Sequence, residues 1–273
     1  MKGAAHSNTY PLGAKKDTLP RYRVFNEIYQ PGTIERFATI AVSPDMHILE
    51  VGCGIGDTAC YMAKSLVPNG HVTAFDQSGE LIELARQQAS DAGIDNVTFA
   101  CVTAQDFVFQ NDCFDLAHSR FVLSYLSDAQ EIVRRIYDAL KPSGYFFGEE
   151  VAQSYIMHGR TGWYDEINRW YANLVECGGG DPEYGLKRLP SDMLTAGFEV
   201  LSAGAYWPID NQPKIIEMIR LAVSREMKPN LVKLGIATES EVDAVVSAMA
   251  ALDDDVVISP PPAIQITGYK PQR

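Results

Sequence analysis

Short, mostly apolar runs alternate with amphipathic stretches through the first half of the chain. The apolar runs have the length and composition of buried strands, and they cover residues 48–51, 72–75, 97–101, 114–118 and 145–149. Between them, apolar positions recur every three or four residues, as on the buried face of a helix. Strands that alternate with helices predict an α/β fold in which a mostly parallel sheet carries helices on both faces.

The pattern differs at the N-terminus. Residues 1–20 are small and polar, and a flexible arm is expected there. Two short helices are predicted over residues 21–40, because apolar positions fall on one face on either side of Pro31-Gly32. Thr33 is the expected cap of the second helix.

Past residue 150 the alternation of strands and helices changes. Residues 21–150 are expected to form the main part of the core and residues 151–188 an inserted helical cap with an aromatic helix. Residues 189–273 complete the core with a sixth strand, two amphipathic helices and a last extended segment over 258–269. The prolines 260–262 cannot donate to a sheet ladder, so they place this last segment away from the centre of the sheet.

A glycine-rich turn follows the first predicted strand. Its sequence is Glu50-Val51-Gly52-Cys53-Gly54-Ile55-Gly56-Asp57. In such sheets a nucleotide-type ligand docks at the carboxyl end of the first strand, where glycines let the backbone turn tightly and approach the ligand. Asp76 ends the second strand, where an acid can accept hydrogen bonds from both hydroxyls of a ribose.

Two classes of ligand compete for a turn of this form. A dinucleotide site reads G-x-G-x-x-G, but Asp57 stands at the third glycine position, and Glu50 and Asp57 would repel a pyrophosphate. S-adenosylmethionine has no phosphate, and its sulfonium and ammonium outweigh its one carboxylate, so its net charge is positive. The acids beside the turn therefore favour S-adenosylmethionine as the cofactor.

The order of motifs resembles that of class I S-adenosylmethionine-dependent methyltransferases, in particular the small-molecule group that includes ubiquinone and menaquinone methyltransferases. The glycine-rich turn is similar to motif I, residues 114–120 are similar to motif IV, and residues 140–144 are similar to the family's Leu-Lys-Pro-Gly-Gly turn with Ser143 in place of the first glycine. The resemblance implies a Rossmann-like, seven-stranded, mostly parallel sheet with helices on both faces, here with a helical cap. It assigns cofactor binding to Glu50, Gly52, Gly54, Gly56, Asp76, Gln77, Thr103, Ala104 and Ser119.

The charge balance and the cysteine spacing narrow the classes of partner. Acidic residues outnumber basic ones 35 to 23, and the formal net charge of -12 argues against nucleic acid and anionic membranes. No run of 18 apolar residues is present, and the five cysteines have neither C-x-x-C nor metal-ligand spacing. We expect a cytoplasmic enzyme that uses no metal and acts on a small-molecule acceptor. The helices within residues 214–252 either pack on the cap or form a homodimer contact.

A general base is needed if the acceptor atom is a hydroxyl or a carbon acid, whereas amines and thiols need less help. The candidates by position are Glu149 and Glu150 at the end of the fifth strand, His118 at the end of the fourth, and His158 in the cap. For each of them a structural role is the favoured interpretation, because helix caps, surface acids and packed histidines are common. The catalytic residue therefore stays unassigned.

Aromatic residues mark the expected acceptor pocket above the carboxyl edge of the sheet. The candidates are Tyr22 and Tyr29 in the N-terminal helices and Trp163 in the cap. A second tryptophan-tyrosine pair follows Trp163-Tyr164 seven residues later, on the same helix face. Such a stripe is either core packing or the wall of a pocket for an aromatic or other apolar acceptor. Two alternatives stay open: a methyltransferase that acts on protein or RNA, and a fold relative that binds the cofactor without methyl transfer, as a cyclase or binding module.

Overall fold

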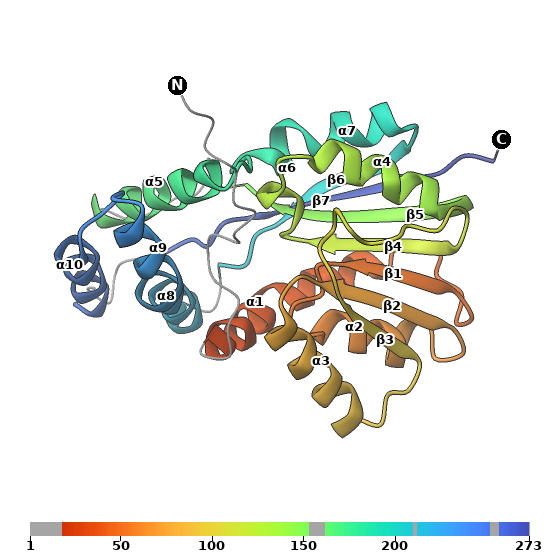
Figure 1. The fold of residues 1–273 in the computed structure, drawn as a ribbon, viewed down its shortest axis with the longest axis horizontal. Coiled ribbons are helices and arrows are strands. Elements are labelled where there is room, and N and C mark those ends of the chain that lie inside the picture. Colours follow the sequence, from red (N-terminus) through yellow and green to blue (C-terminus); the bar gives the residue numbers. More distant parts are fainter. Residues whose placement is uncertain (1–17, 153–161, 210–211, 252–256, 273) are drawn as a thin grey trace.

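A computed structural model describes residues 18–152, 162–209, 212–251 and 257–272 (Figure 1). Its centre is a seven-stranded sheet with the order β3-β2-β1-β4-β5-β7-β6. The strands are β1 (His47–Val51), β2 (His71–Asp76), β3 (Val97–Cys101), β4 (Phe114–Arg120), β5 (Leu140–Val151), β6 (Glu199–Tyr206) and β7 (Ala263–Tyr269). The first five strands are parallel to one another, and β7 is antiparallel to both β5 and β6. The predicted fold class is confirmed.

Helices cover both faces of this sheet (Figure 1). One face carries α1 (Leu19–Phe37), α2 (Asp57–Tyr61) with its π-helical continuation η2 (Met62–Leu66), and α3 (Gly79–Asp91). The other face carries α4 (Ala129–Ala139), α6 (Tyr184–Lys187) and α7 (Leu189–Ala196). Because both faces are covered, Ile48, Leu49 and Val51 of β1 are completely buried, which explains why this strand is a nearly continuous apolar run.

A further group of helices lies beyond the carboxyl ends of the parallel strands (Figure 1). It consists of α5 (Gly162–Cys177), α8 (Gln212–Leu221), the π-helical segment η5 (Ala222–Met227), α9 (Lys228–Lys233) and α10 (Glu239–Ala250). Trp170 of α5 shares one buried cluster with Met218 of α8 and Val245 of α10. Packing on the cap and a homodimer contact were the two alternatives for the C-terminal helices. Among the described residues, these helices pack on α5, which belongs to the predicted cap.

The prediction of two helices in the N-terminal region is wrong. Pro31 lies inside the continuous helix α1, and Thr33 is an interior residue of it rather than a cap. A proline removes one backbone hydrogen bond from a helix, but the contacts of α1 with the sheet outweigh this loss. The glycine has a packing role, because a Cβ atom on Gly32 would lie 2.2 Å from Cγ of Tyr206 in β6.

The last extended segment lies away from the centre of the sheet, as expected, but it is paired on both sides. β7 lies between β5 and β6 and is not at the margin of the sheet. The prolines 260–262 precede the strand, which begins at Ala263, so every residue of β7 keeps its backbone N–H for the ladder. The proline run limits where pairing begins and does not limit which strand the segment can join.

Two further expectations concern the ends and the surroundings of the fold. The N-terminal arm predicted over residues 1–20 lies, up to residue 17, outside the described residues. Among the helices that are described, none combines the length and the apolar character that crossing a lipid bilayer requires.

Candidate functional site

The glycine-rich turn joins β1 to α2 in a backbone conformation that glycine favours. Gly52, Gly54 and Gly56 have φ angles of 71°, 54° and 83°. A Cβ atom on Gly52 would lie 2.3 Å from Val122 Cγ2, and one on Gly54 would lie 3.4 Å from the ring of Tyr22. Larger residues would therefore strain the turn and fill the space in front of it. This turn is an open backbone cradle at the carboxyl end of β1.

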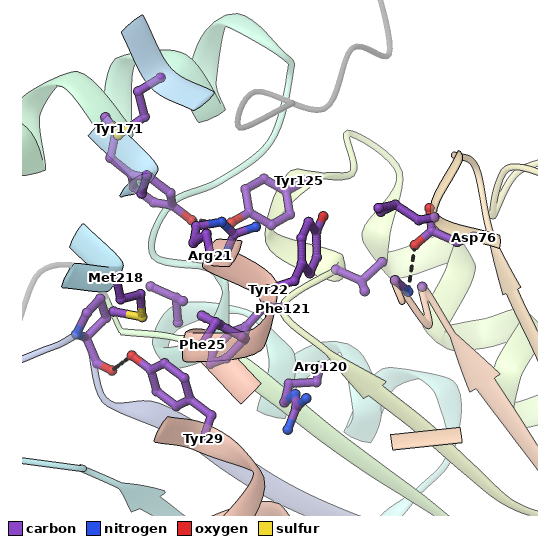
Figure 2. A pocket seen from close by; sticks show the side chains of 18 of the residues that line it. Arg21, Tyr22, Phe25, Tyr29, Asp76, Arg120, Phe121, Tyr125, Tyr171 and Met218 are labelled. Atoms are coloured by element: carbon purple, nitrogen blue, oxygen red, sulfur yellow. Dashed lines mark hydrogen bonds between the residues drawn. The ribbon is translucent and has the colours of Figure 1, made fainter. Parts of the chain in front are cut away.

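Asp76 connects the turn to the end of β2. Its Oδ2 accepts a hydrogen bond from the Gly54 N–H at 3.0 Å, and its Oδ1 accepts one from the Ser78 N–H at 2.9 Å. Burial raises the pKa of this carboxyl, while the backbone amides act in the opposite direction. Two carboxylate oxygens have about four acceptor sites, so Asp76 can still accept from ribose hydroxyls (Figure 2). The cradle and its carboxylates fit a cationic nucleoside such as S-adenosylmethionine.

A cavity of about 220 Å³ lies in front of this turn. Of the predicted cofactor residues, those that line it are Gly52, Gly54, Asp76, Gln77 and Ala104. Phe75, Leu81 and Val102 add apolar surface at the same end. This end can therefore hold an adenosine, with the carboxylate beside the ribose and apolar side chains beside the base.

The other predicted cofactor residues lie behind the cavity wall. Glu50 is 4% exposed and Ser119 is completely buried, and both belong to the interior of the sheet. Thr103 bonds its hydroxyl to Asp106 Oδ2 at 2.7 Å. Gly56 packs at the start of α2, where a Cβ atom would lie 2.7 Å from Cβ of Ala85. In this geometry Gly56 belongs to the turn, none of the four residues lines the cavity, and their contact with a cofactor stays a prediction.

The rest of the cavity has mostly apolar walls from several separate parts of the chain. α1, the β4–α4 connection, α5 and the α8–η5 helix meet there (Figure 2). The apolar and aromatic side chains of this part are Phe25, Tyr29, Phe121, Val151, Tyr164, Ile167, Tyr171, Met218, Ile219, Val223, Met227 and Pro261. A pocket with such walls takes up apolar or aromatic molecules and keeps water away from them.

The tyrosines predicted to line the pocket do so, but the predicted tryptophan does not belong to its lining. Tyr22 lies against the glycine-rich turn, and Tyr29 donates its hydroxyl to the Pro261 carbonyl at 2.7 Å. Burial raises the pKa of Tyr29, so it stays protonated. On α5 the tyrosines Tyr164 and Tyr171 belong to the lining, whereas Trp163 packs against the helical cluster. Neighbouring helical residues differ by about 100° in direction, which explains the difference.

Arg21 is a cavity residue that the sequence reasoning missed. Its Nε donates to Glu226 Oε1 at 2.6 Å, and the two side chains are 6% and 0% exposed. Its guanidinium lies 4.4 Å above the ring of Tyr22. Glu226 belongs to η5, and π-helical segments are common at functional sites. No sequence signal pairs these residues, because 205 positions separate them.

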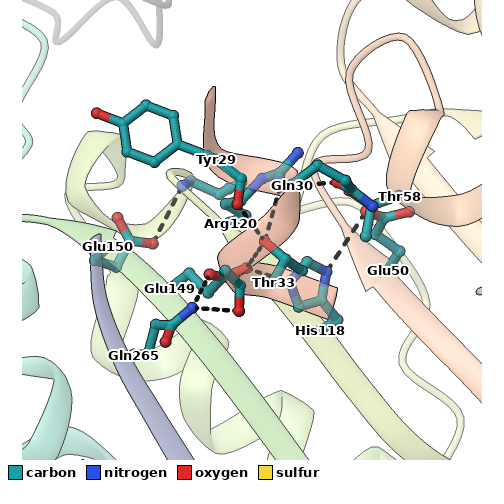
Figure 3. Close-up of polar contacts among 12 residues, drawn as sticks. Tyr29, Gln30, Thr33, Glu50, Thr58, His118, Arg120, Glu149, Glu150 and Gln265 are labelled. Carbon is teal, nitrogen blue, oxygen red and sulfur yellow. Dashed lines mark hydrogen bonds and ion pairs between the residues drawn. The ribbon is translucent and has the colours of Figure 1, made fainter. Parts of the chain in front are cut away.

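The two acids proposed as general bases are both fully engaged in structural contacts (Figure 3). Glu149 Oε1 accepts from the Thr33 hydroxyl at 2.7 Å and contacts His118 Nε2 at 3.1 Å. Burial raises the pKa of Glu149, but the opposite effect of His118 and Arg120 is larger, so the pKa lies below its ordinary value. Neither Glu149 nor Glu150 lines the cavity, so among the described residues neither is placed to touch an acceptor.

Glu150 holds the segment that follows β4. Its Oε1 accepts from the N–H groups of Val122 and Leu123 at 3.1 and 2.7 Å, and its Oε2 accepts from the N–H and hydroxyl of Ser124 at 3.2 and 2.6 Å. Burial raises its pKa to about 7 despite these hydrogen bonds. Val122 is the residue that packs against Gly52, so Glu150 shapes the cavity through the backbone. His158, the remaining candidate, lies outside the described residues.

Comparisons with known proteins agree with this geometry. A family model described as "Methyltransferase domain" matches residues 42–176. A demethylmenaquinone methyltransferase of Listeria monocytogenes is 28% identical over 141 residues, which cover 52% of this chain and 58% of that protein. The chain thus matches little more than half the length of this curated relative.

Solved structures share the fold at low identity. The [4+2]-cyclase SpnF superposes with a TM-score of 0.56 and 22% identity, over 84% of this chain and 76% of that one. Phosphoethanolamine N-methyltransferase 2 of Haemonchus contortus, solved with S-adenosyl-L-methionine, superposes with a TM-score of 0.58 and 18% identity, over 93% and 57% of the two chains. At these identities the superpositions establish the fold alone.

Proposed function

Because the chain contains a class I S-adenosylmethionine-dependent methyltransferase domain, distantly homologous to the demethylmenaquinone methyltransferases, we propose that it methylates a small, apolar or aromatic metabolite. The observation that carries the proposal is the continuity of one cavity, which extends from Asp76 and the glycine-rich turn to the apolar walls under α1 and α5. Donor and acceptor sites of a group transfer must be adjacent, and both ends belong to the lining of this one cavity.

The cofactor end is built from the backbone of the glycine-rich turn and from Asp76. Gly52 and Gly54 leave room for the amino acid part of the cofactor, and Asp76 would accept the ribose hydroxyls. When bound, S-adenosylmethionine supplies a methyl group that is already activated by its sulfonium. The protein therefore mainly has to align two molecules and exclude water.

The acceptor end is built from α1, α5 and the α8–η5 helix. Tyr22, Phe25 and Tyr29 of α1 cover it from one side, and Tyr171 and Met218 close it from the other (Figure 2). These residues would orient a flat or apolar acceptor towards the glycine-rich turn. A strongly hydrated acceptor would lose its water shell there without equivalent polar contacts, so the site discriminates in favour of apolar molecules.

Radioactive methyl transfer tests this proposal directly. The purified chain is incubated with methyl-labelled cofactor and two sets of acceptors, hydroxylated aromatic or quinol compounds and, for contrast, phosphoethanolamine. Label is expected in the first set and not in the second. Preferred methylation of phosphoethanolamine would contradict the assignment of an apolar acceptor. Conversion of an acceptor without label transfer would favour the alternative of a cyclase, an activity that the structurally similar SpnF is named for.

A pair of matched variants ties the activity to the cavity. Ala222 lines the apolar end, and Ala248 is exposed on α10. Ala222→Phe should fill part of the 220 Å³ and raise the KM for the acceptor about tenfold or more while cofactor affinity stays unchanged. Ala248→Phe, the same change on an exposed helix, should leave both quantities unchanged. Equal kinetics of the two variants would move the acceptor site elsewhere.

A further inference from the structure

The face of the sheet beneath α1 is polar, although it is buried. Glu50 of β1 is in register with His118 of β4, and Arg120 of β4 is in register with Glu149 of β5, which in turn faces Gln265 of β7. Residues in register on neighbouring strands point to the same face. Four strands therefore present charged or amide side chains to the same helix (Figure 3).

His118 is the centre of this polar face. Its Nδ1 lies 3.5 Å from Glu50 Oε1, and its Nε2 lies 3.1 Å from Glu149 Oε1. The His118 and Glu149 side chains are 0% and 1% exposed, and that of Glu50 is 5% exposed. A neutral imidazole has only one N–H, so it could donate to just one of these carboxylates. The doubly protonated ring directs one N–H to Glu149 as a hydrogen bond and the other towards Glu50 as an ion-pair contact, which is too long for a hydrogen bond.

α1 is held on this face by the same network. The Thr33 hydroxyl donates to Glu149 Oε1 at 2.7 Å and accepts from Arg120 Nη1 at 2.9 Å. Arg120 also donates to the side-chain oxygens of Gln30 and Asn26, at 3.0 and 2.8 Å. These contacts position α1, the helix whose Tyr22, Phe25 and Tyr29 cover the cavity. The position of this cover thus depends on buried polar contacts and not only on apolar packing.

The charges of the network cancel only when His118 is protonated. Glu50 and Glu149 carry two negative charges, and Arg120 carries one positive charge. A protonated His118 supplies the second positive charge, whereas a neutral ring leaves an uncompensated buried carboxylate. Such a charge is costly in the interior of a protein, and the structure can relieve the cost by separating α1 from the sheet.

We propose that His118 is a positioning residue, whose protonated ring between Glu50 and Glu149 holds α1 as the cover of the cavity and so sets the affinity for the cofactor. The inference rests on the proposed function, because it takes this cavity as the cofactor site. It adds a role for a residue behind the cavity wall, which touches neither cofactor nor acceptor and acts through Glu149 and Thr33.

The direction of the pH effect follows from the surroundings of the ring. Burial lowers the pKa of His118, but the opposite effect of the Glu149 and Glu50 carboxylates is larger, so the pKa lies above its ordinary value of 6.5. Among the described residues, Phe37 of α1 and Phe147 of β5 pack against the ring and carry no charge. On α2, burial raises the pKa of Cys60 to about 11, so this thiol stays neutral. A raised pKa stabilises the docked helix at low pH, and this stabilisation disappears as the pH rises through the raised value.

Calorimetric titration with S-adenosylhomocysteine between pH 6 and pH 9 tests the inference. The wild-type affinity should fall with rising pH, about tenfold for each unit by which docking raises the pKa of His118. His118→Gln keeps one N–H donor but cannot titrate, so its affinity should be lower at pH 6 and should lack this pH dependence. His71→Gln, which removes an imidazole whose pKa burial lowers at the first residue of β2, is the matched control and should follow the wild type. Parallel pH profiles of wild type and His118→Gln would overturn the inference.

Hydrogen exchange of α1 gives a readout that needs no ligand. Protection of the amides of α1, corrected for the intrinsic pH dependence, should fall in the wild type as the pH rises, while that of α3 stays constant. Thr33→Val removes the hydroxyl between Arg120 and Glu149 without changing side-chain shape, and it should reduce the protection of α1 at every pH, even if His118→Gln does not fold. Constant protection of α1 in wild type and variant would overturn the inference. Failure of the wild type to bind any cofactor analogue would refute the proposed function instead, and the exchange data would still decide the role of His118.

Discussion

Replacing Glu150 by glutamine should destabilise the protein at low pH, but this loss of stability relative to the wild type should disappear or change sign at high pH. The carboxyl is completely buried and accepts four hydrogen bonds from residues 122–124. Burial raises its pKa from 4.5 to about 7, so between these values the folded protein holds a proton that the unfolded chain has lost. Stability therefore falls as the pH rises through this window.

The size of the effect follows from the width of the window. Each pH unit between 4.5 and about 7 reduces the free energy of unfolding by about 1.4 kcal/mol, so the wild type loses about 3 kcal/mol in total. Glutamine cannot titrate and avoids this loss. Its amide oxygen can accept from Val122 and Leu123, while its amide nitrogen faces the Ser124 N–H, which costs about 1–3 kcal/mol at every pH. Glu150→Gln is therefore expected to be less stable than the wild type at pH 4.5 and about equally or more stable at pH 8.

Urea unfolding at the two pH values, followed by tryptophan fluorescence, measures this difference. Glu217→Gln, on the exposed side of α8, is the matched control and should show no pH-dependent difference from the wild type. A difference between Glu150→Gln and wild type that is the same at both pH values would refute the reasoning. Because Glu150 acts on the cavity only through the backbone of residues 122–124, the folded variant should keep kcat for methyl transfer, and a loss of kcat with unchanged KM values would restore Glu150 as a catalytic candidate.

Three other variants test the site and the core. Asp76→Ala should weaken binding of S-adenosylmethionine by about 1–3 kcal/mol, because the ribose loses a charge-assisted hydrogen bond, and an unchanged calorimetric affinity would count against this placement of the cofactor. Gly52→Ala should lower the melting temperature more than Gly93→Ala. Both glycines have positive φ, but only at position 52 would the new Cβ atom lie 2.3 Å from Val122. Equal shifts of the two variants in a thermal scan would contradict the steric argument. Trp170→Ala should cost about 3–5 kcal/mol in urea unfolding because this side chain is 1% exposed, and a loss below about 1 kcal/mol would show that it is not part of the core.

Some parts of the fold and the site could be predicted because their causes are local. Each strand of the parallel half is a short apolar run, and each run alternates with an amphipathic helix, so the order of elements follows from periodicity. The positive φ angles of Gly52, Gly54 and Gly56 and the acid at the end of β2 are likewise local properties of the chain. At Pro31-Gly32 local propensity predicted a break between two helices. The helix continues there because packing, including the contact of Gly32 with Tyr206, outweighs local propensity.

The sequence by itself determined the α/β alternation and the position of the glycine-rich turn, since the periodicity of apolar residues and the conformational freedom of glycine are written within a few neighbouring positions. Only the tertiary structure decided that β7 lies between β5 and β6, that Arg21 meets Glu226 and that Glu149 and Glu150 are buried outside the cavity lining. These outcomes depend on contacts between distant segments, whose energies are comparable with one another and leave no trace in local composition. They are decided only when packing of the whole chain brings the partners together.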